Sequence, residues 1–286
     1  EALRKVYQDP DSKWRQYVNR ILNEVDPHVI KMSALDYGFE AAFCGKKEIN
    51  EMRVKHQCNI PWLILMDPTS ACNLHCTGCW AAEYGNRLNL SFEDMDRIVT
   101  QGKELGIYLY FFTGGEPLVR KDDIIRLCEK HDDCGFHAFT NGTLIDAPLA
   151  ERIHATGFDY VGISLDGIGA THDKFRRLAG AFERSLAAVR HLQKLGTKVG
   201  LRFTMTELNA HDLPNLLQLM REENVDKFYF SHLNYAGRGN IHRGKDARHI
   251  ATRAALDLLY DTAWADARDG GQHEYVTGNN DADGVY

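Results

Sequence analysis

The 286-residue sequence lacks any long apolar run, since no stretch approaches the roughly 18–20 residues that a membrane-spanning helix needs. It also lacks an excess of basic residues. The net charge is -6 and the pI is near 6.1, which argues against nucleic acid as the main partner. No signal-peptide pattern is visible. These absences predict a cytoplasmic protein that binds neither membranes nor nucleic acid.

Cysteine is scarce and unevenly placed. The chain has seven cysteines, an odd number without regular spacing, which argues against a disulfide framework and for a reducing compartment. Three of them fall close together, and the others are scattered at Cys44, Cys58, Cys128 and Cys134. We expect these four to be buried small apolar residues rather than ligands.

Length and composition predict the domain organisation. With 44% hydrophobic residues, the chain is long enough for one large α/β domain with an extension. Residues 1–57 are rich in charge and helix formers, and we expect a helical N-terminal extension there. Residues 58–269 hold the main domain, and the polar residues 270–286 are expected to be a linker toward an absent C-terminal region. Because the sequence starts at Glu1, we expect a fragment of a longer protein.

From residue 60 onward, apolar strands alternate with amphipathic helices. The expected strands are 62–66, 108–112, 136–139, 160–165, 198–205 and 227–231. The expected helices are 91–105, 122–130, 147–155, 182–195, 213–222 and 252–267. Such alternation predicts an α/β fold with a parallel sheet. Six units are too few to close an eight-stranded barrel, so we predict a partial (β/α)6 TIM-like barrel whose active site lies in the loops after the strands.

Cys72, Cys76 and Cys79 follow the first predicted strand in the spacing C-x3-C-x2-C. Three thiolates can hold three irons of a 4Fe-4S cluster and leave the fourth iron open to another ligand. A zinc site with His75 as fourth ligand is the alternative. Structural zinc usually draws on two paired ligand clusters, and the sequence has no matching second cluster. We favour the iron–sulfur interpretation because a second motif accompanies it.

That second motif is Thr113-Gly114-Gly115-Glu116-Pro117, directly after the second predicted strand. Its glycines permit close approach of the backbone to a ligand, and its glutamate places a carboxylate beside them. An ordinary tight turn would also use Gly-Gly and proline, so the motif is weak by itself. Its position downstream of three clustered cysteines favours a functional role.

Together, the two motifs resemble those of the radical S-adenosylmethionine superfamily. The resemblance implies a 4Fe-4S cluster on the three cysteines and S-adenosylmethionine on the open iron. It further implies reductive cleavage to a 5′-deoxyadenosyl radical that takes hydrogen from a substrate, with a reductase or flavodoxin-type protein as electron donor. One position departs from the family pattern. Gly78 stands where the residue before the third cysteine is usually aromatic, and Trp80 just after it is expected to cover the adenine or the cluster instead.

The resemblance also assigns cofactor contacts to the ends of later strands. The expected cofactor-binding residues are Gly114, Gly115, Glu116, Asn141, Ser164, Arg176 and Leu233. Glu116 is expected to receive the amino group of S-adenosylmethionine and Arg176 its carboxylate, both as charge-assisted contacts. Leu233 is expected against the adenine. The alternatives are a capping role for Ser164 and a solvated side chain for Arg176.

Basic residues gather after the fifth and sixth predicted strands. Arg202, on the fifth strand, would need an anion if it pointed into the barrel. Segment 234–240 and the residues after it would make one side of the barrel mouth cationic, which suits a carboxylate-rich substrate. A solvated basic loop is the alternative. The candidate substrate-binding residues are Arg202, His232, Arg238 and His242.

Two branches of the superfamily resemble different parts of the chain. Residues 200–213, 234–240 and 277–284 are similar to the radical enzymes of haem d1 biosynthesis (NirJ type, related to the SPASM enzymes). This implies a tetrapyrrole substrate and removal of propionate from decarboxylated sirohaem. Residues 67–72 and 79–86 are more similar to a broad, unassigned group. The alternatives are a maturase that modifies a peptide or protein side chain, and a non-catalytic metal or iron–sulfur module.

Overall fold

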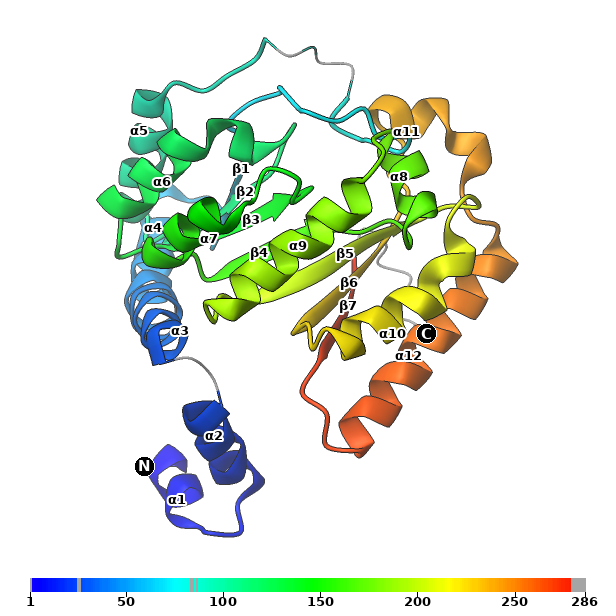
Figure 1. The fold of residues 1–286 in the computed structure, drawn as a ribbon. Helices are drawn as coiled ribbons and strands as arrows, with labels where there is room; N and C mark the ends of the chain where they lie inside the picture. Colours follow the sequence, from blue (N-terminus) through cyan, green and yellow to red (C-terminus); the bar gives the residue numbers. More distant parts are fainter. Residues whose placement is uncertain (1, 25–26, 83–84, 86, 279–286) are drawn as a thin grey trace.

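The computed structural model describes residues 2–24, 27–82, 85 and 87–278 of the chain. Its centre is a seven-stranded parallel sheet in the order β1-β2-β3-β4-β5-β6-β7, so every strand pairs with its neighbours in the sequence. The sheet curls on itself, and the connecting helices lie along its outer side (Figure 1). This is the partial barrel that the strand–helix alternation predicts.

The strands agree with the expected positions, with one addition. They are β1 Ile64–Met66, β2 Leu109–Phe112, β3 Gly135–Thr140, β4 Tyr160–Ser164, β5 Val199–Met205, β6 Lys227–His232 and β7 Glu274–Gly278. The prediction of a linker over 270–286 is wrong for β7, whose residues pair in parallel with β6 from Lys227 to Ser231. Residues 279–286, including most of the stretch 277–284, lie outside the described residues.

Helices follow the strands at nearly the predicted positions. They are α5 Phe92–Glu104, α6 Lys121–Lys130, α7 Ala147–Ala155, α9 Ala181–Lys194, α10 Leu213–Glu222 and α12 His249–Arg268. Ser91 caps the start of α5, because its Oγ accepts a hydrogen bond from the Asp94 N–H at 3.0 Å. Two short helices were not predicted, α8 Ala170–Arg176 and α11 Gly237–Ile241, and both belong to loops at the candidate site.

The main core lies between the sheet and the outer helices. Alternate strand residues point outward and are fully buried there, among them Phe112, Phe136, Phe203, Phe228 and Phe230. Many of the residues between them face the barrel interior and are only partly buried, among them Phe111, Arg202 and Tyr229. The period of two along each strand therefore separates an apolar packing face from an accessible inner face.

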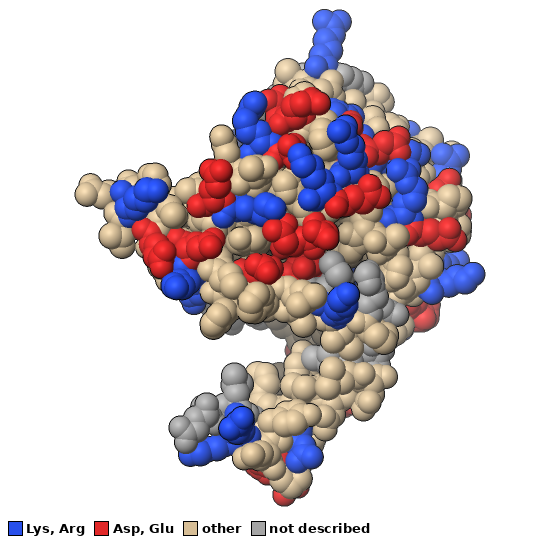
Figure 2. Space-filling view, turned by 90° about the vertical axis from the view of Figure 1, so that its left-hand side faces the viewer, with Lys and Arg blue, Asp and Glu red and all other residues tan. Residues whose placement is uncertain are grey.

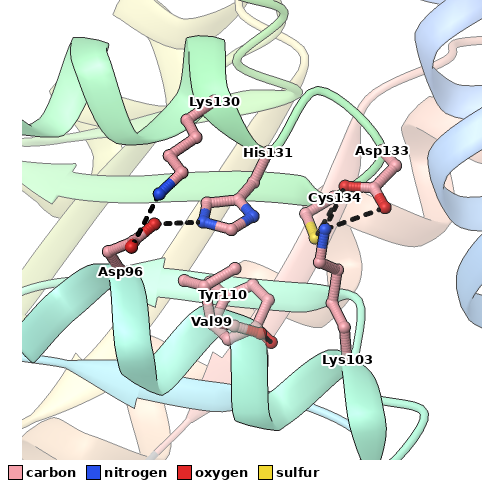
Figure 3. Close-up of polar contacts among 8 residues, drawn as sticks. All are labelled: Asp96, Val99, Lys103, Tyr110, Lys130, His131, Asp133 and Cys134. Carbon is pink, nitrogen blue, oxygen red and sulfur yellow. Dashed lines mark hydrogen bonds and ion pairs between the residues drawn. The ribbon is translucent and has the colours of Figure 1, made fainter.

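Helices α5 and α6 are joined by polar contacts across their outer surfaces (Figure 3). Asp96 accepts from Lys130 Nζ at 2.7 Å and contacts the ring of His131 at 2.9 Å, while Lys103 pairs with Asp133 at 3.0 Å. On the face of the molecule where these helices lie, Lys and Arg alternate with Asp and Glu (Figure 2). This face carries no large field of one sign.

The N-terminal residues are helical, as expected. They form α1 Ala2–Gln8, α2 Lys13–Glu24, α3 Pro27–Met32, the π-helix η1 Ser33–Gly45 and α4 Lys46–His56. Helices α1 and α2 project away from the barrel (Figure 1), and the Trp14 side chain is exposed. The π-helix instead packs at the amino-terminal end of β3, where the Tyr37 hydroxyl contacts the ring of His137. Among the described residues, no helix has the length and apolarity to cross a membrane.

Candidate active site

A pocket lies at the carboxyl-terminal ends of the strands, where the sequence predicts the active site. It is lined by Cys72, Cys76, Gly78, Cys79, Trp80, Thr113, Gly114, Gly115, Glu116, Phe139, Thr140, Asn141, Ser164, Asp166, Phe175, Arg176, Arg202 and Thr204. The three cysteines therefore share one cavity with six of the seven predicted cofactor-binding residues. Leu233 is not among the lining residues; it is buried, and it lies close to Gly78 of the cysteine loop.

The cysteine loop is held from two sides. The Thr77 N–H donates to the Phe175 carbonyl at 2.9 Å, which ties the loop to α8. On the other side, Arg238 Nε donates to the Cys76 carbonyl at 2.8 Å, and the Arg238 N–H donates to the Cys79 carbonyl at 2.9 Å. Loop residues without regular structure are thus fixed by backbone hydrogen bonds on either side of the thiols.

The three thiols are the donors that the sequence assigns to a 4Fe-4S cluster. Among the residues that the structure describes, no group of three His, Cys, Asp or Glu side chains converges as the ligands of one metal ion do, and His75 is exposed. In a four-iron cluster each thiolate binds a different iron, so a wider arrangement is required. Burial raises the pKa of Cys72 to about 11 and also raises that of Cys79, which favours the neutral thiols as long as no metal is bound. Metal binding would displace those protons.

The other four cysteines differ in how far they are buried. Cys128 and Cys134 are buried in the packing between sheet and helices, as expected, whereas Cys58 is exposed and Cys44 is partly exposed. All seven are free thiols. The expectation of four buried cysteines is therefore wrong for Cys58 and also for Cys44, which is only partly buried.

The two glycines after β2 are required by close backbone contact. A Cβ at Gly114, whose φ is +108°, would lie 2.9 Å from the Thr69 carbonyl oxygen. A Cβ at Gly115 would lie 2.2 Å from the carbonyl oxygen of Ala71, the residue before Cys72. The strand end and the start of the cysteine loop can therefore lie together only without side chains at these two positions.

Glu116 is buried and makes more hydrogen bonds to the protein than its motif alone indicates. Its side chain is 1% exposed, and its carboxylate accepts from the Thr140 hydroxyl at 2.6 Å, the Asn141 N–H at 2.8 Å and the Leu118 N–H at 3.1 Å. Burial raises the pKa of Glu116 although these donors act in the opposite direction. Its observed role is to join the ends of β2 and β3, while its contact with a ligand ammonium stays a prediction.

Asn141 connects the end of β3 to the cysteine loop. Its Nδ2 donates to Asn73 Oδ1 at 2.9 Å, and its Oδ1 accepts from the Thr143 N–H at 2.8 Å. Both ends of the amide are therefore engaged with protein. Ser164, by contrast, lines the pocket with a partly buried side chain at the end of β4.

Arg176 and Asp166 form a buried ion pair beside the cysteines. Arg176 Nη2 lies 2.5 Å from Asp166 Oδ2, and Arg176 Nη1 lies 3.4 Å from the Cys76 sulfur. The other Asp166 oxygen accepts from the Thr204 N–H at 2.9 Å. The solvated arginine that we considered is thus excluded, since Arg176 is positioned by β4 and β5 together.

Sequence reasoning missed His172. This residue is 1% exposed, and its Nδ1 accepts a hydrogen bond from the Asp166 N–H at 3.0 Å. Burial, aided by the charge of Arg176, lowers the pKa of His172 to about 3, which keeps the ring neutral and its Nδ1 able to accept. The available signal was its spacing four residues before Arg176, which places both side chains on one face of a helix.

The predicted cationic mouth has a different arrangement. Arg238 holds the cysteine loop, as described above, and a Cβ at Gly237 would lie 2.8 Å from the Cys79 carbonyl oxygen. Segment 234–240 thus packs on the cysteine loop. Neither His232 nor His242 lines the pocket, and Arg248 pairs with Glu207 at 3.1 Å. Of the four candidate substrate residues, the structure brings only Arg202 into the cavity with the cysteines.

A partial parallel barrel with three loop cysteines and a Gly-Gly-Glu strand end defines a class of enzyme. Residues 66–220 match the model of the Radical SAM superfamily, and these are more than half of the chain. The chain therefore belongs to this superfamily. Its members use a 4Fe-4S cluster and S-adenosylmethionine, so the predicted family, enzyme class and cofactor pair are confirmed.

Two curated relatives are similar over most of the chain. The pre-heme d1 synthase of Dinoroseobacter shibae is 45% identical over 229 residues, which cover 78% of this chain and 56% of the relative. The Fe-coproporphyrin III synthase of Methanosarcina barkeri is 37% identical over 230 residues, covering 78% and 57%. The chain thus spans a little over half the length of these relatives.

A solved structure confirms the fold. Streptococcus suis SuiB, bound to its precursor peptide SuiA, superposes with a TM-score of 0.69 at 19% sequence identity. The match covers 82% of this chain and 53% of SuiB. At this identity the likeness concerns the partial barrel alone.

Proposed function

We propose that this chain is the radical-generating barrel of an enzyme that acts on a carboxylate-rich tetrapyrrole, removing propionate from decarboxylated sirohaem. The observation that carries the proposal is the 45% identity to a pre-heme d1 synthase, followed by 37% identity to an Fe-coproporphyrin III synthase. Both names refer to iron tetrapyrrole chemistry. The same interpretation follows from the haem d1-like residues 200–213 and 234–240.

The residues that would hold the cofactors follow from the pocket. Cys72, Cys76 and Cys79 would hold the cluster, and S-adenosylmethionine would lie among Gly114, Ser164 and Arg176. When bound, this pair supplies a carbon-centred radical that takes hydrogen from a substrate. The pocket residues would orient both groups toward a substrate. An external reductase or flavodoxin-type protein is proposed as electron donor.

The haem d1-like segments support the site from outside it. Asn209 Nδ2 donates to the Asp166 carbonyl at 3.1 Å and to the Thr204 carbonyl at 2.9 Å, which joins the ends of β4 and β5. Arg238 fixes the cysteine loop. These segments thus stabilise the position of the Arg176–Asp166 pair and of the thiols. The seven free thiols also support a reducing, cytoplasmic location.

A maturase that modifies a peptide is the second candidate. It is favoured by the fold shared with SuiB, which was solved with a precursor peptide. The lower identity of that match, 19%, is the reason for ranking it second. Both candidates use the same cofactors and differ in what the barrel interior must bind.

Substrate-dependent formation of 5′-deoxyadenosine tests the proposal. The protein would be reconstituted anaerobically with iron and sulfide, reduced, and supplied with S-adenosylmethionine and either decarboxylated sirohaem or a precursor peptide of the SuiA type. We expect 5′-deoxyadenosine to rise with the tetrapyrrole, together with loss of propionate mass from it. The Cys76→Ala variant provides the background. A rise with the peptide and none with the tetrapyrrole would contradict the proposal.

A further inference from the structure

We propose that Arg202 anchors a carboxylate of the substrate inside the barrel, where Phe139 and Tyr229 hold its guanidinium in place. This inference rests on the proposed function and assigns one contact within it. Arg202 would bind the substrate, whereas we assign Arg176 to the cofactor.

Arg202 occupies the inner face of β5. It pairs in register with Ser164 of β4 and with Tyr229 of β6, and it lines the same pocket as the cysteines. It lies two residues before Thr204, further from the carboxyl-terminal edge of the strand. Its side chain therefore lies on the inner wall of the barrel, level with Ser164 of the neighbouring strand.

The charges around Arg202 are not balanced. The nearby carboxylate of Asp166 is already engaged by Arg176 at 2.5 Å. Within the described part of the chain, no carboxylate lies at ion-pair distance from Arg202, and its buried Nε has no hydrogen-bond partner. Burial lowers the pKa of Arg202, whereas Arg176 next to Asp166 has a raised pKa. A buried guanidinium without an anion is costly, and a ligand anion would remove that cost.

Aromatic rings fix the orientation of this guanidinium. The Arg202 Cζ lies 5.0 Å from the centroid of the Phe139 ring and 5.5 Å from that of Tyr229. A Cβ at Gly162 would lie 2.6 Å from the Phe139 ring, so the glycine of β4 gives that ring the space it occupies. Rings on the faces of a guanidinium leave its hydrogen-bonding edge available. That edge finds no carboxylate partner within the described protein.

The surroundings indicate the kind of ligand. Phe139 contacts Tyr229 at 6.2 Å and Phe111 at 6.1 Å between ring centroids, so aromatic surface continues across the inner face of the sheet. All three side chains are partly exposed toward the interior. Aromatic walls with one unneutralised guanidinium suit a flat conjugated ring that bears carboxylates.

A binding comparison between an acid and its ester tests the anchor. Reconstituted protein would be titrated with ferric coproporphyrin III and with its tetramethyl ester, following the porphyrin absorbance. We expect the wild type to bind the tetra-acid more tightly than the ester, and Arg202→Met to lose about tenfold or more of its affinity for the acid only. Lys227→Met is the matched control, because Lys227 is a cation of the same sheet already paired with Glu274 at 2.9 Å. It should keep the preference for the acid.

The outcomes separate the anchor from the proposed function. An unchanged preference for the acid in Arg202→Met overturns the anchor alone. No binding of either porphyrin by the wild type overturns the tetrapyrrole proposal together with the anchor. Arg202→Lys, which keeps the charge, should retain part of the preference, which excludes a folding defect as the cause. If Arg202→Met instead loses the change that S-adenosylmethionine causes in the cluster EPR spectrum, and its porphyrin affinity is unchanged, Arg202 serves the cofactor and the inference is wrong.

Discussion

The two ends of the barrel surround their buried carboxylates with different partners. At the carboxyl-terminal end, Glu116 and Asp166 are 1% exposed; Glu116 accepts from three protein donors, and Asp166 accepts from the Thr204 N–H and pairs with Arg176. At the amino-terminal end, Asp36 of η1 and Asp159 before β4 are 2% and 6% exposed, and the charges that act on them are those of other carboxylates. At the site end, donors and an arginine oppose the cost of burying a carboxylate, whereas like charges at the other end add to that cost and favour the protonated acids.

We expect the largest effect from replacing a cluster ligand, because the cluster is needed for cleavage of S-adenosylmethionine at the carboxyl-terminal end of the barrel. Cys76→Ala should abolish iron–sulfur binding and reduce cleavage of S-adenosylmethionine by about a hundredfold or more, with the fold retained. Iron content, 5′-deoxyadenosine yield and circular dichroism measure these three properties. Cys58→Ala, a change at an exposed cysteine, is the control. Full cleavage by Cys76→Ala would mean that this thiol is not a ligand.

The amino-terminal acids should make stability depend on pH. Burial, then the charges of Asp133, Asp132 and Glu40, raises the pKa of Asp36 to about 7 from its ordinary value of 3.8. Burial, then the charge of Asp36, raises that of Asp159 to about 8.

Between about pH 4 and pH 8 the folded protein keeps protons that the unfolded chain releases, so the free energy of unfolding falls as pH rises and the full penalty is present above pH 8. Asp36→Asn should therefore stabilise the protein at pH 9 by roughly 3 kcal/mol and have little effect at pH 4. Urea unfolding at the two pH values measures the difference. Equal effects at both would show that Asp36 is not protonated in the fold.

Removing the partner of Arg176 should lower the free energy of unfolding by a comparable amount. Asp166→Asn leaves Arg176 buried without its partner and should lower the free energy of unfolding by about 3 kcal/mol at neutral pH. Glu223→Gln, which breaks the exposed pair with Arg190, should cost less than about 1 kcal/mol. Similar losses for the two variants in urea unfolding would contradict the distinction between a buried network and a surface pair.

We expect the smallest effect from replacing Arg238, which holds the cysteine loop in place. The sequence suggested Arg238 as a substrate-binding residue. Because Arg238 Nε donates to the Cys76 carbonyl, we now expect the variant to lose iron about tenfold faster to a chelator, with porphyrin affinity changed less. Arg243→Ala, in the same loop region but stacked on Tyr235, is the control. Unchanged iron release would show that the contact does not support the cluster.

The sequence predicted those parts of the molecule that follow from local rules. The apolar strands β2 and β5 and the amphipathic helix α9 each depend on residues near one another in the chain, and all three were found. Strand β7 was missed because its five residues, Glu274–Gly278, stand in a polar, Gly-rich tail, and only pairing with β6 makes them a strand.

The same distinction between local and distant contacts applies to the site residues. The cysteines and the Gly-Gly pair were found because their spacing in the sequence carries the chemistry. The roles of His172 and Arg238 depend on partners far along the chain, Arg238 on the loop of Cys76. For the same reason, sequence could place Arg202 on a strand but could not show that Asp166 is engaged by another arginine.

The proposed chemistry depends on three sulfurs that bind one 4Fe-4S cluster and leave its fourth iron open to another ligand. EPR and visible spectra of the anaerobically reconstituted, reduced protein, recorded with and without S-adenosylmethionine, test this directly. We predict the signal of a reduced 4Fe-4S cluster whose spectrum changes when S-adenosylmethionine is added. A protein that contains one zinc and no iron or sulfide would contradict the proposed chemistry. So would a cluster whose spectrum does not change when S-adenosylmethionine is added.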